Sequence, residues 1–386
     1  MAMAATALLL AGCSGSPAQS ARHQSKQTSL QAIPDTSRAP QAQGSPHALA
    51  TIIGGPSYAL GDHLSVSGSV AGRGLLVSVW PTTNSELIAT SAGRLLLLDP
   101  ATGRSENLMG PASPGQEAVM VTSDSHWVFW GRMNDQGGPE SYYLYNVVTG
   151  ARRRFTDALT ASGVDLSGAV LAGDSLYVAG TVKAGRCPVD EVLRVNLATG
   201  EATPMVVARH CAVEAAPRLP KLLSLGGTGL PLKLSGVVVA EPALAGRRLL
   251  FVITPPTDSS VSPPAALVQL DLDNGKAKVL AQSPSLISAL VADPDVAAFV
   301  SGPGLYALVN KGLELLETTQ NPVPTVSGPL VSCGGGSGDV YDVRTGAVYR
   351  PPAVGSWTIL SGSWVSWFDS AAQAYRAARI EPSRLQ

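Results

Sequence analysis

Aromatic and charged side chains are scarce in this chain of 386 residues. Phe, Trp and Tyr make up 5% of it and charged residues 14%, and the formal net charge is −1. So few aromatic residues leave little material for a wide surface that stacks on sugars, and the charge balance offers no attraction to nucleic acid. Beyond the N-terminus there is no run of about 18 or more uncharged apolar residues, so the pattern predicts no transmembrane helix there.

Residues that commonly carry catalysis or bind metals are also few. The five histidines show no metal-ligand spacing, and the Gly-x-Ser-x-Gly turn of many hydrolases is absent. The glycine run that follows Cys333 lacks the Lys-Ser or Lys-Thr pair of a phosphate-binding loop and leads into a strand pattern. We therefore expect no catalytic residues, no metal site and no cofactor.

A short turn phrase, in contrast, recurs along the chain between apolar runs. It consists of Asp or Asn, two residues, Thr or Asn, and Gly. In each copy the first side chain can accept a hydrogen bond from the backbone two residues on, and the glycine can adopt a positive φ, so each copy predicts a β-hairpin. The five copies are Asp99–Gly103, Asn146–Gly150, Asn196–Gly200, Asp271–Gly275 and Asp342–Gly346.

The spacing of these hairpins predicts the architecture. Gly103, Gly150 and Gly200 are 47 and 50 residues apart (150 − 103 and 200 − 150), and a four-stranded propeller blade occupies about 40 to 50 residues. A degenerate copy ending at Gly312 and a final hairpin over residues 364–380 bring the number of units to seven. We predict an all-β, seven-bladed β-propeller, with six or eight blades as alternatives. A strand from about Leu64 to Val70 is expected to pair with the C-terminal blade and close the ring.

The turn phrase over residues 70–386 resembles two propeller groups, the YVTN-type or quinoprotein-like proteins and the wider WD40-like superfamily. In quinone-dependent dehydrogenases the phrase continues to a Trp four residues after the Gly. The corresponding positions of this chain hold Asn107, Arg154, Pro204, Val279 and Arg350. The resemblance therefore implies the fold and does not imply a quinone cofactor.

The N-terminus predicts export and membrane attachment. Residues 1–12 are apolar and small, without a preceding Lys or Arg, and Leu10-Ala11-Gly12-Cys13 resembles the bacterial lipobox. The resemblance implies that Cys13 is acylated and that the protein is a lipoprotein on the extracytoplasmic face of the cell membrane. Residues 13–50 are rich in Ser, Gln, Ala and Pro and are expected to form a disordered tether, followed by the propeller over residues 51–386.

Three further cysteines are present. Cys187 and Cys211 flank the last two strands expected in the third blade, so both should emerge at one end of the ring, where a disulfide between them is one option. Cys333 has no evident partner.

Long connections indicate where a partner would bind. Those over residues 133–141, 183–191 and 255–266 join the second and third strands of blades 2 to 4, and the extra residues near 209–235 leave blade 3, so all four lie at one end of the ring. Loops on a rigid scaffold often carry function, although neutral insertion is the alternative reading. The polar residues assigned to this candidate rim are Arg132, Asp135, Glu140, Arg186, Asp190, Arg209 and Asp258.

These observations predict a non-catalytic scaffold that binds a protein or another component of the cell envelope. The alternative is an enzyme, such as a lactonase-like hydrolase, with its site at the mouth of the central channel. That alternative requires His, Glu or Arg side chains that converge at the channel.

Overall fold

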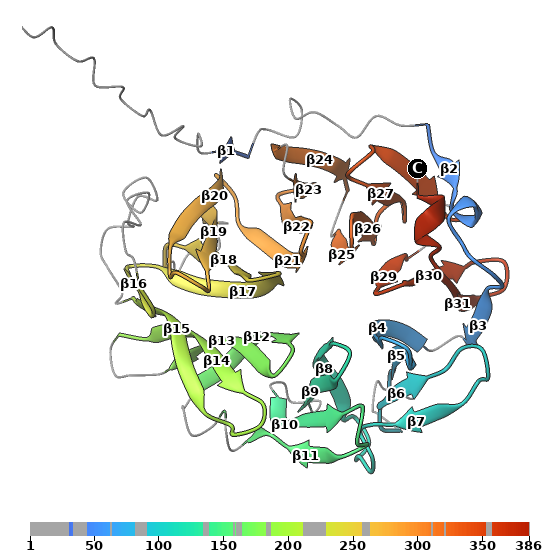
Figure 1. Cartoon of the computed structure of the whole chain (residues 1–386), viewed down its shortest axis with the longest axis horizontal. Helices are drawn as coiled ribbons and strands as arrows, with labels where there is room; N and C mark the ends of the chain where they lie inside the picture. The colour runs from blue at the N-terminus through green and yellow to red at the C-terminus, as the bar shows by residue number, and fades with distance from the viewer. Residues whose placement is uncertain are drawn as a thin grey trace, which may run out of the picture.

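Seven small antiparallel sheets stand around a central axis (Figure 1). The structure is a computed structural model, and it describes residues 31–33, 45–61, 64–81, 91–133, 139–156, 159, 164–182, 187–210, 229–256, 263–309, 312–319, 322–352 and 357–385. The chain is therefore an all-β, seven-bladed propeller, as the spacing of its turns predicts.

Each blade has four antiparallel strands, which follow one another from the axis outward. Blade 1 contains β4 (Leu64–Val70), β5 (Gly74–Val79), β6 (Arg94–Leu98) and β7 (Ser105–Asn107), and blade 2 contains β8 (Glu117–Ser123), β9 (Trp127–Met133), β10 (Pro139–Asn146) and β11 (Arg152–Arg154). Blade 3 contains β12 (Val164–Ala172), β13 (Ser175–Val182), β14 (Val189–Asn196) and β15 (Ala202–Arg209), and blade 4 contains β17 (Val238–Ala245), β18 (Arg248–Thr254), β19 (Ala265–Asp271) and β20 (Ala277–Ser283).

The remaining blades follow the same order. Blade 5 contains β21 (Ile287–Asp293), β22 (Val296–Ser301), β23 (Gly304–Val309) and β24 (Gly312–Thr318), and blade 6 contains β25 (Val323–Ser327), β26 (Leu330–Gly334), β27 (Val340–Asp342) and β28 (Ala347–Arg350). Blade 7 contains β29 (Ile359–Ser361), β30 (Trp364–Asp369), β31 (Ala374–Arg379) and β3 (Tyr58–Gly61).

The recurring phrase forms the turn between the third and fourth strands, and its chemistry is the predicted one. In blade 1 the Asp99 carboxylate accepts a hydrogen bond from the backbone N–H of Ala101 at 3.0 Å, and the N–H of Gly103 donates to the Asp99 carbonyl at 2.9 Å. The glycines of all five copies have φ between +67° and +79°. Each of these turns therefore uses a conformation that side chains other than glycine rarely adopt.

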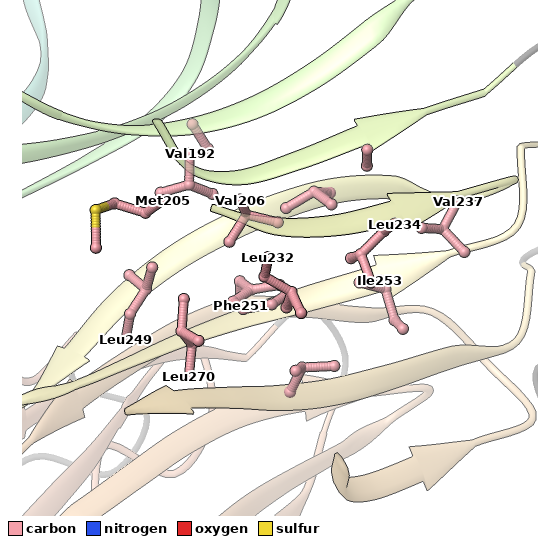
Figure 2. Close-up of a cluster of buried hydrophobic side chains, with 14 of the residues drawn as sticks. Val192, Met205, Val206, Leu232, Leu234, Val237, Leu249, Phe251, Ile253 and Leu270 are labelled. Atoms are coloured by element: carbon pink, nitrogen blue, oxygen red, sulfur yellow. The ribbon is translucent and has the colours of Figure 1, made fainter. Parts of the chain in front are cut away.

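Hydrophobic packing lies between the blades. The described residues contain seven buried clusters, and each one joins the facing sheets of two neighbouring blades. Figure 2 shows the cluster between blades 3 and 4, where Met205 and Val206 of β15 meet Leu249 and Phe251 of β18. Because every blade buries both faces in this way, the ring is stabilised at all seven junctions.

The strand that closes the ring differs from the prediction. Leu64–Val70 is β4, the innermost strand of blade 1, and it pairs with β5. Closure comes from β3, the segment immediately before it, which pairs antiparallel with β31 and supplies the outermost strand of blade 7. The prediction was wrong by one strand. Tyr58–Gly61 and Leu64–Val70 both have the sequence of a β-strand, and only their position in the ring determines which of them pairs with β31.

The N-terminal segment also contributes short parallel strands to the outside of the ring. β1 (Gln31–Ala32) pairs with β20 of blade 4, and β2 (His47–Ala48) pairs with β28 of blade 6. Ile33 is buried in the cluster between blades 4 and 5. Within the range predicted to be a tether, residues 31–33 and 45–50 are thus bound to the propeller; the part before Gln31, with Cys13, lies outside the described residues.

Candidate functional site

The alternating direction of the strands gives the ring two different ends. We call the end that carries the connections between second and third strands, and between blades, the rim end. The other end, which carries the turns between first and second strands and between third and fourth strands, is the turn end. The order of the strands assigns the predicted long connections to the rim end, and most of their residues lie outside the described part of the chain.

Three of the residues assigned to the candidate rim can be placed with their side chains. These are Arg132, Asp190 and Arg209; Asp135, Arg186, Asp258 and the side chain of Glu140 lie outside the described part of the chain. Arg132 is half-buried, donates to the carbonyl of Met109 in the connection leaving blade 1 at 2.6 Å and lies over the ring of Tyr143. Arg209 is exposed at the end of β15.

Asp190 does not lie on the surface, which corrects its assignment to the rim. Its side chain is 1% exposed. One carboxylate oxygen accepts from the Thr181 hydroxyl at 2.7 Å, and the other accepts from the backbone N–H of Val239 in blade 4 at 2.9 Å. His210 Nε2 lies 3.3 Å from the second oxygen. Asp190 therefore joins blades 3 and 4 and is not available to a partner.

The cysteines are placed only in part. Cys187 is half-buried just before β14 and is not a free thiol, whereas Cys211 lies outside the described residues, so the pairing of the two stays a prediction. Cys333 is a free, buried thiol in β26. Burial, together with the negative charge of Glu317, raises the pKa of Cys333, so the thiol stays protonated and unreactive.

Large apolar side chains are exposed at the rim end of four consecutive blades, and this feature was missed in the sequence. They are Leu286 (41% exposed) before β21 of blade 5, Val323 (42%) at the start of β25 of blade 6, Trp357 (39%) before β29 of blade 7, and Trp80 (55%) after β5 of blade 1. We call these four side chains the apolar rim. Their exposure is hard to predict from the sequence, because each residue directly adjoins a strand, where an apolar side chain is as readily buried as exposed.

The innermost strands that line the central axis carry few charges. In β17, Glu241 occupies a bulge with a positive φ of 55°, and Ala289 occupies a similar bulge in β21 of the next blade. Burial raises the pKa of Glu241, while hydrogen bonds that its carboxyl accepts from the backbone N–H groups of Leu290 and Ala289 act in the opposite direction. Glu241 thus joins blades 4 and 5 near the axis.

A polar pocket of about 500 Å³ opens at the turn end, between the inner turns of blades 1, 2 and 7. Its charged lining residues are Arg379 and Asp124, and several serines surround them, including Ser69, Ser123 and Ser361. The Arg379 guanidinium lies 5.0 Å from the centre of the Trp364 ring. One Asp124 oxygen accepts from the backbone N–H groups of His126 and Trp127, so it stabilises the turn.

Two kinds of site are not found in the described part of the chain. It contains no group of three or more His, Cys, Asp or Glu side chains with a geometry that could hold a metal ion. It also contains no helix with the length and apolar character that crossing a bilayer demands.

Comparisons with known proteins support the fold alone. No protein-family model matches the chain, and no curated protein matches it either. Among solved structures, the β-propeller domain of the Trilobed protease from Pyrococcus furiosus matches with a TM-score of 0.50 and 9% identity, over 80% of this chain and 90% of that one. An oligogalacturonate lyase from Vibrio parahaemolyticus matches with a TM-score of 0.50 and 11% identity, over 89% and 94% of the two chains.

A structure of prolyl endopeptidases also matches, with a TM-score of 0.50 and 14% identity, over 87% of this chain and 48% of that one. Identities this low show a shared propeller fold and do not transfer an activity. The Pyrococcus furiosus domain is described as having an open Velcro topology. This chain differs in that β3 pairs with β31 and closes the ring.

Proposed function

We propose that the protein is a lipoprotein scaffold, held on the extracytoplasmic face of the membrane through Cys13, that binds a protein partner with the apolar rim. The observation that carries the proposal is the exposure of Trp80, Leu286, Val323 and Trp357 at one end of four consecutive blades. The Trp357 ring packs directly on the backbone of β26 at Gly334. A Cβ atom built on Gly334 would lie only 3.2 Å from the Trp357 ring and 3.2 Å from the Val323 carbonyl oxygen. This packing supports a preformed surface.

A protein partner fits this surface better than a small polar ligand. Tryptophan is enriched at the centres of protein interfaces, where its burial often dominates the binding free energy. Exposed apolar side chains at one end of a monomer commonly mark such interfaces when a partner buries them together. The seven buried junctions hold the blades rigidly, so the partner would meet a surface that needs little reorganisation.

The test has two steps. Proteins cross-linked to the acylated chain in intact envelopes are identified first. The purified candidate partner is then titrated with the wild type, with W80A/W357A and with the control V148A. Val148 is 72% exposed but lies at the turn end. Loss of both tryptophans should weaken binding by about thirtyfold or more, and V148A should leave it unchanged. Equal affinities of W80A/W357A and the wild type would refute the apolar rim.

Membrane attachment has its own test. At high salt, which screens any attraction between basic side chains and anionic lipid, the full chain with Cys13→Ser should move from the membrane fraction to the soluble fraction of the envelope, because the acyl chains supply most of the attachment. Retention of that variant in the membrane at physiological salt and at high salt would contradict acylation at Cys13.

A second candidate function is hydrolysis in the polar pocket at the turn end, and the pocket itself is the observation that favours it. Arg379 is exposed and could bind a substrate carboxylate, and Asp124 is the pocket's one carboxylate. If this proposal is correct, the purified protein should hydrolyse lactone substrates, and the R379A variant should not. Turnover that R379A leaves intact, or no turnover at all, would exclude the pocket as the site.

A further inference from the structure

The outer edge of blades 2 to 4 is positively charged. The fourth strands of these blades, β11, β15 and β20, contain no acidic residue, and neither do the short strands that pair parallel with them at the sheet edge, β16 (Leu232–Ser235) on β15 and β1 on β20. They carry six exposed cations: Arg152, Arg153, Arg154, Arg209, Lys233 and Lys278. We call these six residues the basic edge.

The remaining blades have the opposite character. Their fourth strands, β24, β28, β3 and β7, carry three acidic residues, Glu314, Glu317 and Glu106, and one cation, Arg350. Arg350 is bound to the buried carboxylate of Asp339 at 2.9 and 2.7 Å. In a chain with a net charge of only −1, the positive charge of the outer edge is therefore concentrated on three adjoining blades.

Contacts link the neighbouring blades that carry the basic edge. Arg153 donates to the carbonyl of Leu197, which belongs to blade 3, and the N–H of Gly229 before β16 donates to the carbonyl of Gly275 in blade 4 at 3.4 Å. Figure 1 shows β11, β15, β16 and β20 along one stretch of the circumference. Within the described residues, none of the six cations takes part in an ion pair.

The path of the chain leads the N-terminal segment to the same edge. β1 pairs with β20, so the chain joins the ring at the outside of blade 4 (Figure 1). Cys13 precedes Gln31 by 18 residues (31 − 13), and the sequence between them contains Arg22 and Lys26 and no acidic residue. An acyl anchor at Cys13 would therefore bring the chain onto the ring at this edge, about 5–6 Å × √18 from the bilayer on average.

We infer that the basic edge binds the anionic phospholipid headgroups of the membrane that carries the Cys13 anchor. The inference rests on the membrane attachment in the proposed function and adds an orientation to it. Lys and Arg close to an anionic bilayer are attracted to it, and a basic patch is an effective second signal beside an acyl chain. With this edge on the bilayer, the propeller axis lies along the membrane plane, and the apolar rim and the turn-end pocket both stay open to solvent.

The experiment measures vesicle binding without the anchor. The full chain with Cys13→Ser is sedimented with vesicles of phosphatidylcholine alone and with vesicles in which about a third of the lipid is phosphatidylglycerol. We expect binding only to the anionic vesicles, lost at about 0.5 M salt. On this background K233E/K278E should lower the partition coefficient about tenfold or more. The matched control R94E/R104E makes the same change in net charge on exposed residues of blade 1 and should change it less than about threefold.

Three results would overturn the inference: no binding of the Cys13→Ser chain to anionic vesicles, equal binding of K233E/K278E and its parent, or equal loss in both charge-reversal variants. Binding to heparin without binding to vesicles would also overturn it, since the edge would then recognise a soluble polyanion. Circular dichroism confirms that the variants fold. Because this assay uses unacylated protein and residues outside the apolar rim, its failure is distinguishable from failure of acylation or of partner binding.

Discussion

Carboxylates that are buried or half-buried connect neighbouring blades in this propeller. Asp190 joins blades 3 and 4, Glu241 joins blades 4 and 5, and Glu317 of blade 5 accepts from the Ser337 N–H and hydroxyl and from the Tyr341 hydroxyl of blade 6. Each carboxylate accepts hydrogen bonds from backbone or side-chain donors at the junction between two blades, where these donors would otherwise be unpaired. At the scale of single residues, these carboxylates are therefore expected to act on stability.

Replacing Asp190 with alanine should destabilise the fold by about 2 to 4 kcal/mol, because the buried Val239 N–H and the half-buried Thr181 hydroxyl would lose their acceptor. Urea unfolding followed by circular dichroism measures the change. Asp273→Ala is the control, since Asp273 is exposed and paired with the exposed Arg247, and it should leave the unfolding midpoint nearly unchanged. A midpoint for D190A equal to that of the control would show that Asp190 does not join the blades.

Glu241 should make stability fall as the pH rises. Burial raises its pKa in the folded protein above the ordinary value of 4.5, so the folded chain keeps a proton that the unfolded chain has already lost. The contribution is complete below the unfolded pKa and disappears as the pH passes through the folded pKa. Glu241→Gln removes this dependence, so its stability relative to the wild type should increase from about pH 4 to about pH 7.5 in urea unfolding. A difference that stays constant with pH would contradict the raised pKa.

At the scale of elements, ring closure depends on one short strand. β3 covers the edge of β31, and Leu60 is buried between blades 7 and 1 with Trp364 and Leu75. Without β3, β31 would present a row of unpaired N–H and C=O groups, which is a template for association with other chains. The segment that closes the ring therefore also protects it from aggregation.

A chain that begins at residue 64 should consequently aggregate, whereas one that begins at residue 45 and keeps β2 and β3 should stay monomeric. Size-exclusion chromatography with light scattering separates the two outcomes. A milder change, Leu60→Ala, should keep the monomer and lower the free energy of unfolding by about 2 to 4 kcal/mol. If the chain starting at residue 64 were monomeric and as stable as the longer one, β3 would not be the closing element.

The turns show why much of this fold can be predicted from sequence. Asp99–Gly103 and its four copies determine their own hydrogen bonds and positive φ within five residues, so the hairpins and their period are local properties. The closing strand is not local: β3 and β31 are more than 300 residues apart in the chain. Leu64–Val70 has the same alternating character as Tyr58–Gly61, and only the register of the whole ring distinguishes them.

The candidate site was harder to predict for the same physical reason. Asp190 adjoins a long connection, which suggests exposure, but the next blade covers it and uses its carboxylate. Trp357 precedes an apolar strand, which suggests burial, but it lies at the rim end, where no further sheet follows. Exposure of a side chain beside a strand depends on the neighbouring blade, and the sequence of one blade does not contain that information.

At the scale of the whole molecule, the three candidate surfaces lie on different parts of the propeller. The apolar rim lies at one end of the ring, the polar pocket lies at the other, and the basic edge lies on the circumference between them. A flat bilayer that meets the circumference leaves both ends of the ring free, so a protein partner can bind the apolar rim at the same time. The alternative is that the apolar rim itself enters the bilayer, since tryptophan also favours the membrane interface.

Tryptophan quenching separates these two orientations. Of the six tryptophans, Trp80 and Trp357 are the most exposed, at 55% and 39%, so they should account for most of the quenching by aqueous acrylamide. If the basic edge faces the membrane, quenching of the acylated protein should be the same on anionic vesicles as for the Cys13→Ser chain in solution. If the apolar rim enters the bilayer, vesicles should protect both tryptophans and shift their emission to shorter wavelength. Protection that W80A/W357A abolishes would therefore place the rim in the membrane and leave the partner without a free surface.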